Sequence, residues 1–191
     1  MRGFDSHRLA HMLLSHRTVQ SDHRLPITAH RLRYIFFTGN GMQYKALLVT
    51  ETPEGKFERS IIKRSVDDLP KGDVLIRVHY SALNYKDGLS ATGHKGITKR
   101  FPHTPGIEAA GRVVSSTSPL FQKDNEVFIT GYDLGMNTPG AYAEYIRVPA
   151  DWVMRKPASL TCKDCMTIGT AGFTAAYALY KMEAMGQTPD Y

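Results

Sequence analysis

The sequence predicts a mainly β domain followed by helices, and three observations support this. Short segments of alternating apolar and polar residues recur between turn signals from residue 42 to about residue 150, which is typical of a small β-barrel or sandwich. After residue 158 the apolar spacing becomes helical. Hydrophobic residues make up 42% and charged residues 22% of the 191 residues, so a real core is expected.

The expected strands are separated by segments rich in proline and glycine. The segment 74–80 is the clearest, because β-branched residues alternate with polar ones along it. Pro102 and Pro105 bracket a segment that should be an extended loop. The other expected strands are 46–49, 57–63, 106–115, 125–130 and 141–148.

Two helical runs are expected at the C-terminal end. Thr161 is followed three residues later by Asp164, a pattern that predicts a helix N-terminus. A helix over about 163–168 should be interrupted at Gly169, and a second should run over 173–185.

The positive charge is concentrated in the first 41 residues. They hold six arginines and two acidic residues, which accounts for four of the six net positive charges. The remainder is nearly balanced, which argues against a nucleic-acid partner. The basic tail has the composition of a transit peptide, but strand patterning begins right after Met42, so we expect the tail to be disordered or non-native. Without a signal peptide or an apolar run long enough to span a membrane, we expect a cytoplasmic location.

Cys162 and Cys165 stand in a C-x-x-C spacing. This spacing occurs in redox pairs and as half of a zinc site, but no second ligand pair with suitable spacing follows. We favour the interpretation that they are two small residues in the first turn of a helix.

Four segments in order carry a family resemblance. They are Ser-Ala-Leu-Asn-Tyr-Lys-Asp at 81–87, Pro-Gly-Ile-Glu-Ala-Ala-Gly at 105–111, Gly-Tyr-Asp-Leu-Gly-Met at 131–136 and Gly-Thr-Ala-Gly-Phe-Thr-Ala at 169–175. Together they resemble the medium-chain dehydrogenase/reductase superfamily, and more closely its zinc-free branch of acryloyl-CoA reductases and quinone oxidoreductases.

The resemblance implies a domain plan. Residues 42–160 would form the GroES-like β-barrel catalytic domain, and 161–191 the helical start of the connection to a nucleotide-binding Rossmann domain. The glycine-rich turn that holds the cofactor pyrophosphate in such a domain would lie beyond residue 191, so we expect the chain to be an N-terminal fragment of the enzyme. Most cofactor contacts would then be missing, and we expect the isolated chain not to oxidise NADPH.

The resemblance also implies the chemistry. Zinc-dependent relatives carry Cys at the position of Asn84 and Gly-His-Glu where this chain has Gly-Ile-Glu at 106–108, so no metal is expected. NADPH would deliver hydride to an activated carbon–carbon double bond, as in an acryloyl-CoA-like enoyl thioester, or to a quinone. The partner would be that small molecule, with no nucleic acid or membrane, and the parent enzyme would be a homodimer.

Three residues match family positions in the cleft. Asn84 and Tyr85 would be catalytic, and Tyr85 and Thr170 would contact the cofactor. Each has a structural alternative: Asn84 capping a turn, Tyr85 filling the barrel mouth and Thr170 satisfying a helix break. Asp87 could orient Lys86 or a backbone group, and a packing or capping role explains it as well. Glu108 matches an acidic position that is often structural. The competing function is a non-catalytic GroES-like binding or oligomerisation module.

Overall fold

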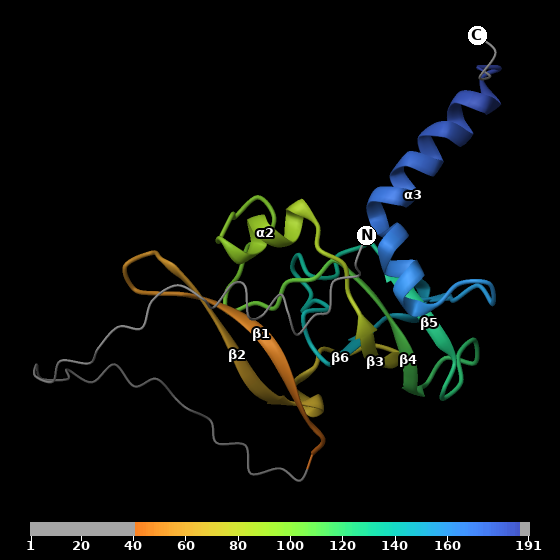
Figure 1. Ribbon diagram of the computed structural model, residues 1–191. Helices are drawn as coiled ribbons and strands as arrows, with labels where there is room; N and C mark the ends of the chain where they lie inside the picture. Colours follow the sequence, from red (N-terminus) through yellow and green to blue (C-terminus); the bar gives the residue numbers. More distant parts are fainter. Residues whose placement is uncertain (1–40, 188–191) are drawn as a thin grey trace, which may run out of the picture.

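The computed structural model describes residues 41–187, in which the strands form two antiparallel sheets (Figure 1). The basic tail predicted for the first 41 residues lies outside the described residues, apart from Gly41. The last four residues, 188–191, lie outside them as well.

The smaller sheet is a hairpin of β1 (Gln43–Glu51) and β2 (Phe57–Ser65). Both strands extend beyond their predicted bounds. The hairpin is attached to the rest of the fold through β1, where Val49 and His103 exchange backbone hydrogen bonds of 2.8 and 2.9 Å. The predicted extended loop between the two prolines therefore also serves as a pairing partner for β1.

The larger sheet has five strands in the order β6-β3-β4-β5-β7. Its central strands confirm the predicted pattern, while β6 begins four residues later than expected and the two-residue β7 was not predicted. The strands are β3 (Val74–Tyr80), β4 (Glu108–Ser116), β5 (Glu126–Thr130), β6 (Tyr145–Val148) and β7 (Met154–Arg155).

The alternation along β3 divides its side chains between two apolar clusters. Val74 and Ile76 point into the main core, whereas Leu75, on the opposite face, packs with Tyr44 and Ala46 of β1. This is the period of two that the sequence shows, because successive side chains of a strand point to opposite faces. The hairpin thus covers one face of the sheet and the main core lies on the other.

A seven-residue helix, α2 (Tyr85–Ala91), follows β3 and was not predicted from the sequence. Its start is a capping box between Asn84 and Asp87. Two single-turn 3₁₀ helices, Val66–Asp68 and Ala150–Trp152, occupy connections elsewhere.

The long helix α3 (Cys162–Ala184) begins at the predicted capping box of Thr161 and Asp164. Its first two turns cover β4 and β5. At Gly169 the backbone leaves the helical conformation, as predicted, and the second segment starts at Thr170 rather than at 173. Beyond this kink nearly every side chain is exposed, and Figure 1 shows the helix projecting away from the sheets.

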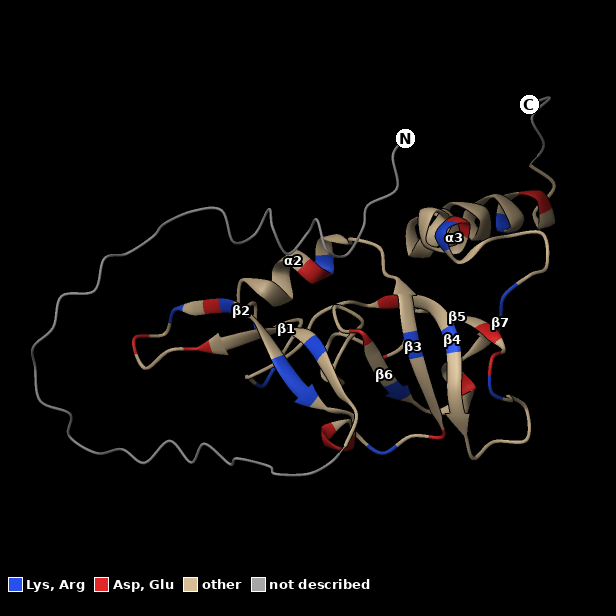
Figure 2. Cartoon of the chain, turned by 60° about the horizontal axis from the view of Figure 1, so that its bottom comes forward, with Lys and Arg blue, Asp and Glu red and all other residues tan. Residues whose placement is uncertain are grey.

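None of the helices in residues 41–187 combines the length and the apolar character needed to cross a bilayer. Basic and acidic residues both occur along the hairpin and stand next to each other in α2 (Figure 2). This mixed surface agrees with the near balance of charge expected for the folded part.

Candidate functional site

The predicted pair Asn84 and Tyr85 lies where the chain leaves β3 and enters α2. Asn84 is the extended residue that precedes the helix, with φ −118° and ψ 159°, and it is partly buried. Its backbone N–H donates to Oδ2 of Asp87 at 2.8 Å. Tyr85, the first helical residue, is 83% exposed. The helix start therefore holds Asn84 in place and leaves the tyrosine ring open to a ligand.

Asp87 fastens this helix to the segment before β4. Its side chain is buried, and its Oδ1 accepts hydrogen bonds from the backbone N–H groups of Gly106 at 3.1 Å and Ile107 at 3.0 Å. Burial raises the pKa of Asp87, although the backbone hydrogen bonds from Asn84, Ile107 and Gly106 oppose the rise. Asp87 therefore fills both roles considered for it in the sequence, because it caps α2 and also orients the backbone at Gly106 and Ile107.

Gly106 allows the close approach that this anchoring needs. Its φ is +112°, a value that L side chains rarely adopt, and a Cβ there would lie 2.6 Å from the backbone nitrogens of Ala141 and Tyr142. The chain can therefore pass tightly under the neighbouring loop, and Ile107 and Glu108 follow in fixed positions.

Glu108, the first residue of β4, joins two of the predicted site residues. It is only 1% exposed. Its Oε1 accepts a hydrogen bond from Asn84 Nδ2 at 2.5 Å, and its Oε2 accepts from the Thr170 backbone N–H at 2.7 Å and from the Thr170 hydroxyl at 3.1 Å. Carboxylate oxygens only accept, so the nitrogen of the Asn84 amide must face Glu108. Asn84 and Thr170 therefore lie on either side of one buried carboxylate.

Gly169 makes room for this arrangement. Its backbone, with φ 50° and ψ −163°, breaks α3 so that a new helical segment starts at Thr170. A Cβ on Gly169 would lie 2.9 Å from both carboxylate oxygens of Glu108. The carboxylate accepts the Thr170 N–H at the start of this segment, where a negative charge is favourable.

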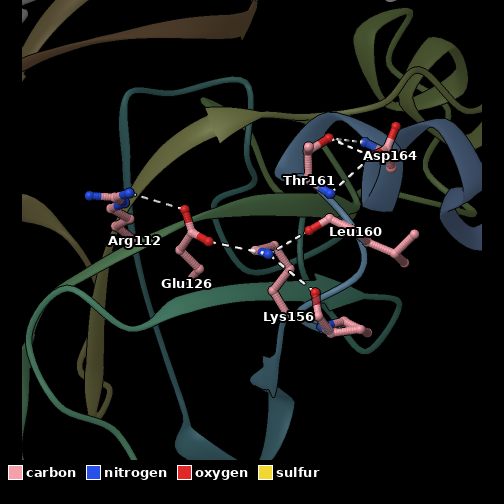
Figure 3. Close-up of polar contacts among 7 residues, drawn as sticks. Arg112, Glu126, Lys156, Leu160, Thr161 and Asp164 are labelled. Carbon is pink, nitrogen blue, oxygen red and sulfur yellow. Dashed lines mark hydrogen bonds and ion pairs between the residues drawn. The ribbon is translucent and has the colours of Figure 1, made fainter.

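A charged cluster on the sheet holds the segment that leads into α3 (Figure 3). Glu126 pairs with Arg112 at 3.1 Å and with Lys156 at 3.2 Å. The Lys156 ammonium also donates to the backbone oxygens of Pro157 and Leu160, at 3.1 and 2.5 Å. The start of α3 is thus held by Lys156 and its kink by Glu108, which together fix Thr170 relative to β4.

The two cysteines lie in the first turn of α3, as the favoured interpretation had it. Both thiols are free and buried against Ala110 and Met166, and burial raises the pKa of each. Within residues 41–187, no group of three or more His, Cys, Asp or Glu side chains is placed to hold a metal ion.

The structure thus brings Asn84 and Thr170 together through Glu108, while the Tyr85 side chain, next to Asn84, makes no hydrogen bond among residues 41–187. The site residues predicted from the sequence did not include Glu108. One signal was available: Glu108 is a lone acid opening an apolar run, a pattern that often marks a buried charge with partners.

Residues 70–158 match the family described as the alcohol dehydrogenase GroES-like domain. Over 149 residues the chain is 38% identical to the acrylyl-CoA reductase AcuI of Ruegeria pomeroyi, covering 78% of this chain and 45% of that enzyme. It is 46% identical over 126 residues to YhfP of Bacillus subtilis, whose name places it with the quinone oxidoreductases, covering 66% of this chain and 38% of that protein. The chain therefore spans less than half the length of these relatives.

Solved structures agree with this similarity. The crystal structure of Escherichia coli YhdH with bound NADPH superimposes with a TM-score of 0.72 at 43% identity, covering 76% of this chain and 45% of that one. The crystal structure of YhfP, with NAD bound, gives 0.74 at 40% identity, covering 78% and 45%. The arrangement of sheets and helices described above is thus shared with both of these nucleotide-bound proteins.

Proposed function

We propose that this chain, which belongs to the medium-chain dehydrogenase/reductase superfamily through its GroES-like domain, forms the substrate-side wall of an NADPH-dependent reductase. The proposed substrate is an activated alkene such as acryloyl-CoA, or a quinone, reduced without zinc. The observation that carries the proposal is the pair of bonds by which Glu108 holds Asn84 and Thr170 beside each other.

Asn84 has the chemistry to stabilise the reduced substrate. Its amide nitrogen carries two hydrogens, and one is donated to Glu108. No group in residues 41–187 accepts the other. We assign this second N–H to the carbonyl oxygen of the substrate, on which negative charge develops as hydride arrives at the β-carbon. A proton from solvent at the α-carbon then completes the reduction.

Thr170 and Tyr85 suit the nicotinamide end of the cofactor. The second segment of α3 begins within Gly-Thr-Ala-Gly and looks like a phosphate-binding helix N-terminus. However, the Glu108 carboxylate already accepts the Thr170 N–H and would repel a phosphate. The Thr170 hydroxyl donates its hydrogen to Glu108, so its lone pairs remain free to accept a bond from the carboxamide N–H. The exposed ring of Tyr85 offers an apolar face beside it. When bound, NADPH supplies the hydride.

The donor set supports zinc-free chemistry. Ile107, at the position where zinc-dependent relatives carry a histidine, has no ligand atom and is buried. The Asn84 nitrogen is engaged by Glu108. Zinc in proteins is bound by thiolate, imidazole and carboxylate groups, and the two thiols of this chain are buried in a different cluster.

A chimera tests the proposal. Residues 42–187 replace the matching N-terminal part of the Escherichia coli relative, and NADPH oxidation is measured with acryloyl-CoA and with a quinone. We expect turnover with at least one of them, unaffected by a zinc chelator, and an Asn84→Leu chimera that binds NADPH but loses most of the rate. A folded chimera that binds NADPH and reduces neither compound would contradict the proposal, and loss of activity with the chelator would refute its zinc-free part.

A further inference from the structure

We infer that Glu108 is the positioning residue of this site: one buried carboxylate that turns the Asn84 amide into an oriented donor and the Thr170 hydroxyl into an oriented acceptor. The ligand roles of these two groups rest on the proposed function. The orientation itself rests on the contacts alone.

The number of donors around Glu108 defines what can occupy its place. Three donors converge on it, the Asn84 amide on Oε1 and the N–H and O–H of Thr170 on Oε2. An ionised carboxylate satisfies all of them because it accepts on both oxygens. A glutamine of the same shape has one oxygen and one NH₂ group. If its oxygen faced Thr170, its NH₂ group would face Asn84, and the Asn84 amide would have to turn its oxygen inward to accept. The site therefore requires a carboxylate for a reason of polarity, beyond filling space.

Glu108 also sets the direction of the second segment of α3. Among residues 41–187, every hydrogen bond that joins the segment from Thr170 onward to the sheets goes to Glu108. The anchored cysteine turn before Gly169 is buried, whereas the segment after it is exposed. Beyond the kink apolar packing therefore contributes little, and the carboxylate is the group that ties the start of the second segment to β4.

Removing the acceptor at residue 108, and then exchanging donor and acceptor between residues 84 and 108, distinguishes a positioning role of Glu108 from a role in packing alone. In the full 191-residue chain, nuclear magnetic resonance follows the backbone amide of Thr170 and the side-chain amide of Asn84. Glu108→Met, which keeps the length of the side chain but has no acceptor, should lower the hydrogen-exchange protection of the Thr170 amide about 10- to 100-fold, the loss of one charge-assisted hydrogen bond. The Asn84 side-chain protons should shift toward the positions of a free amide, while the amides of Ile76 and Val113 in the core stay unchanged.

The double variant Asn84→Asp with Glu108→Gln restores complementary partners with donor and acceptor exchanged. The introduced glutamine amide would donate to the introduced aspartate and accept from Thr170. We expect Thr170 protection to return to within about threefold of the wild-type value, since a neutral acceptor makes a somewhat weaker bond. If Glu108→Met alone fails to fold, recovery of the fold and of the Thr170 shift in the double variant supports the inference, and failure to recover overturns it.

Two further results would overturn the inference. One is an unchanged Thr170 amide in Glu108→Met, and the other is an equal loss of protection at Ile76 and Val113, which would mean a general loss of stability. These spectra need no cofactor, so they can fail while the chimera is an active reductase. Conversely, a folded chimera that binds NADPH but reduces neither compound would refute the proposed function and leave the orientation by Glu108 supported.

Discussion

Gly169→Ala is the substitution to which the kink should be most sensitive. The backbone at φ 50° and ψ −163° lies in a region that is essentially restricted to glycine, and holding alanine there costs about 1–3 kcal/mol. The new Cβ would lie 2.9 Å from both oxygens of Glu108, so the carboxylate must move away from residue 169. Weakening its bonds to Thr170 adds about 1.5–3 kcal/mol. We therefore expect the free energy of unfolding to fall by roughly 3–5 kcal/mol, or the kink to straighten.

Urea unfolding followed by circular dichroism measures this loss, with Gly88→Ala as the matched control. Gly88 lies in α2, and a Cβ added there would meet no atom within 4 Å, so alanine should stabilise the chain by about 0.5–1 kcal/mol. In a Glu108→Ala background the cost of Gly169→Ala should shrink to the backbone part, about 1–3 kcal/mol. A Gly169→Ala chain as stable as the wild type, with the kink retained, would refute the reasoning.

Three other predictions concern the surroundings of the site. Burial raises the pKa of Asp87 in the folded chain. The difference in free energy of unfolding between the wild type and Asp87→Asn should therefore be largest below the usual pKa range of a carboxyl group and should decline as the pH rises through the raised pKa. Urea unfolding at a series of pH values checks this, and a difference that grows with pH would contradict it. Because burial raises the pKa of Cys162 and Cys165, iodoacetamide should label neither thiol in the native chain at neutral pH and should label both in urea. Mass spectrometry measures the labelling, and rapid labelling of the native chain would contradict this prediction. Lys156→Met should lower the free energy of unfolding by about 1–2 kcal/mol by leaving two carbonyls without their donor, whereas exposed Lys163→Met should change it little in the same assay.

The sheet could be predicted because each strand carries its own evidence. Along 74–80 the alternation of side chains follows directly from burial on two faces, and β3 has these bounds. The capping box at Thr161 is similarly local. In contrast, α2 has only seven residues and no apolar period, and it depends on Asp87 contacting backbone near Gly106, far along the chain.

The candidate site was only half predictable for the same reason. Asn84 and Thr170 were identified through resemblance, but the group that joins them could not be chosen from local pattern. Glu108 lies 24 residues from Asn84 and 62 residues from Thr170 in the sequence. Its burial and its three donors exist only once β4, α2 and the kink of α3 meet. In the sequence, Glu108 is recognisable only as a single acidic residue at the start of an apolar run.

The most direct test of the role of Glu108 compares kcat/KM for NADPH-dependent reduction in the chimera and in its Asn84→Asp, Glu108→Gln double variant. The double variant keeps Thr170 in place but replaces the N–H donor of Asn84 with a carboxylate. We predict that kcat/KM falls at least about 100-fold, the usual cost of losing a donor to a developing oxyanion, while the Thr170 resonance stays near its wild-type position. An unchanged rate in that variant would contradict the central claim that Glu108 serves to orient Asn84 as a donor to the substrate.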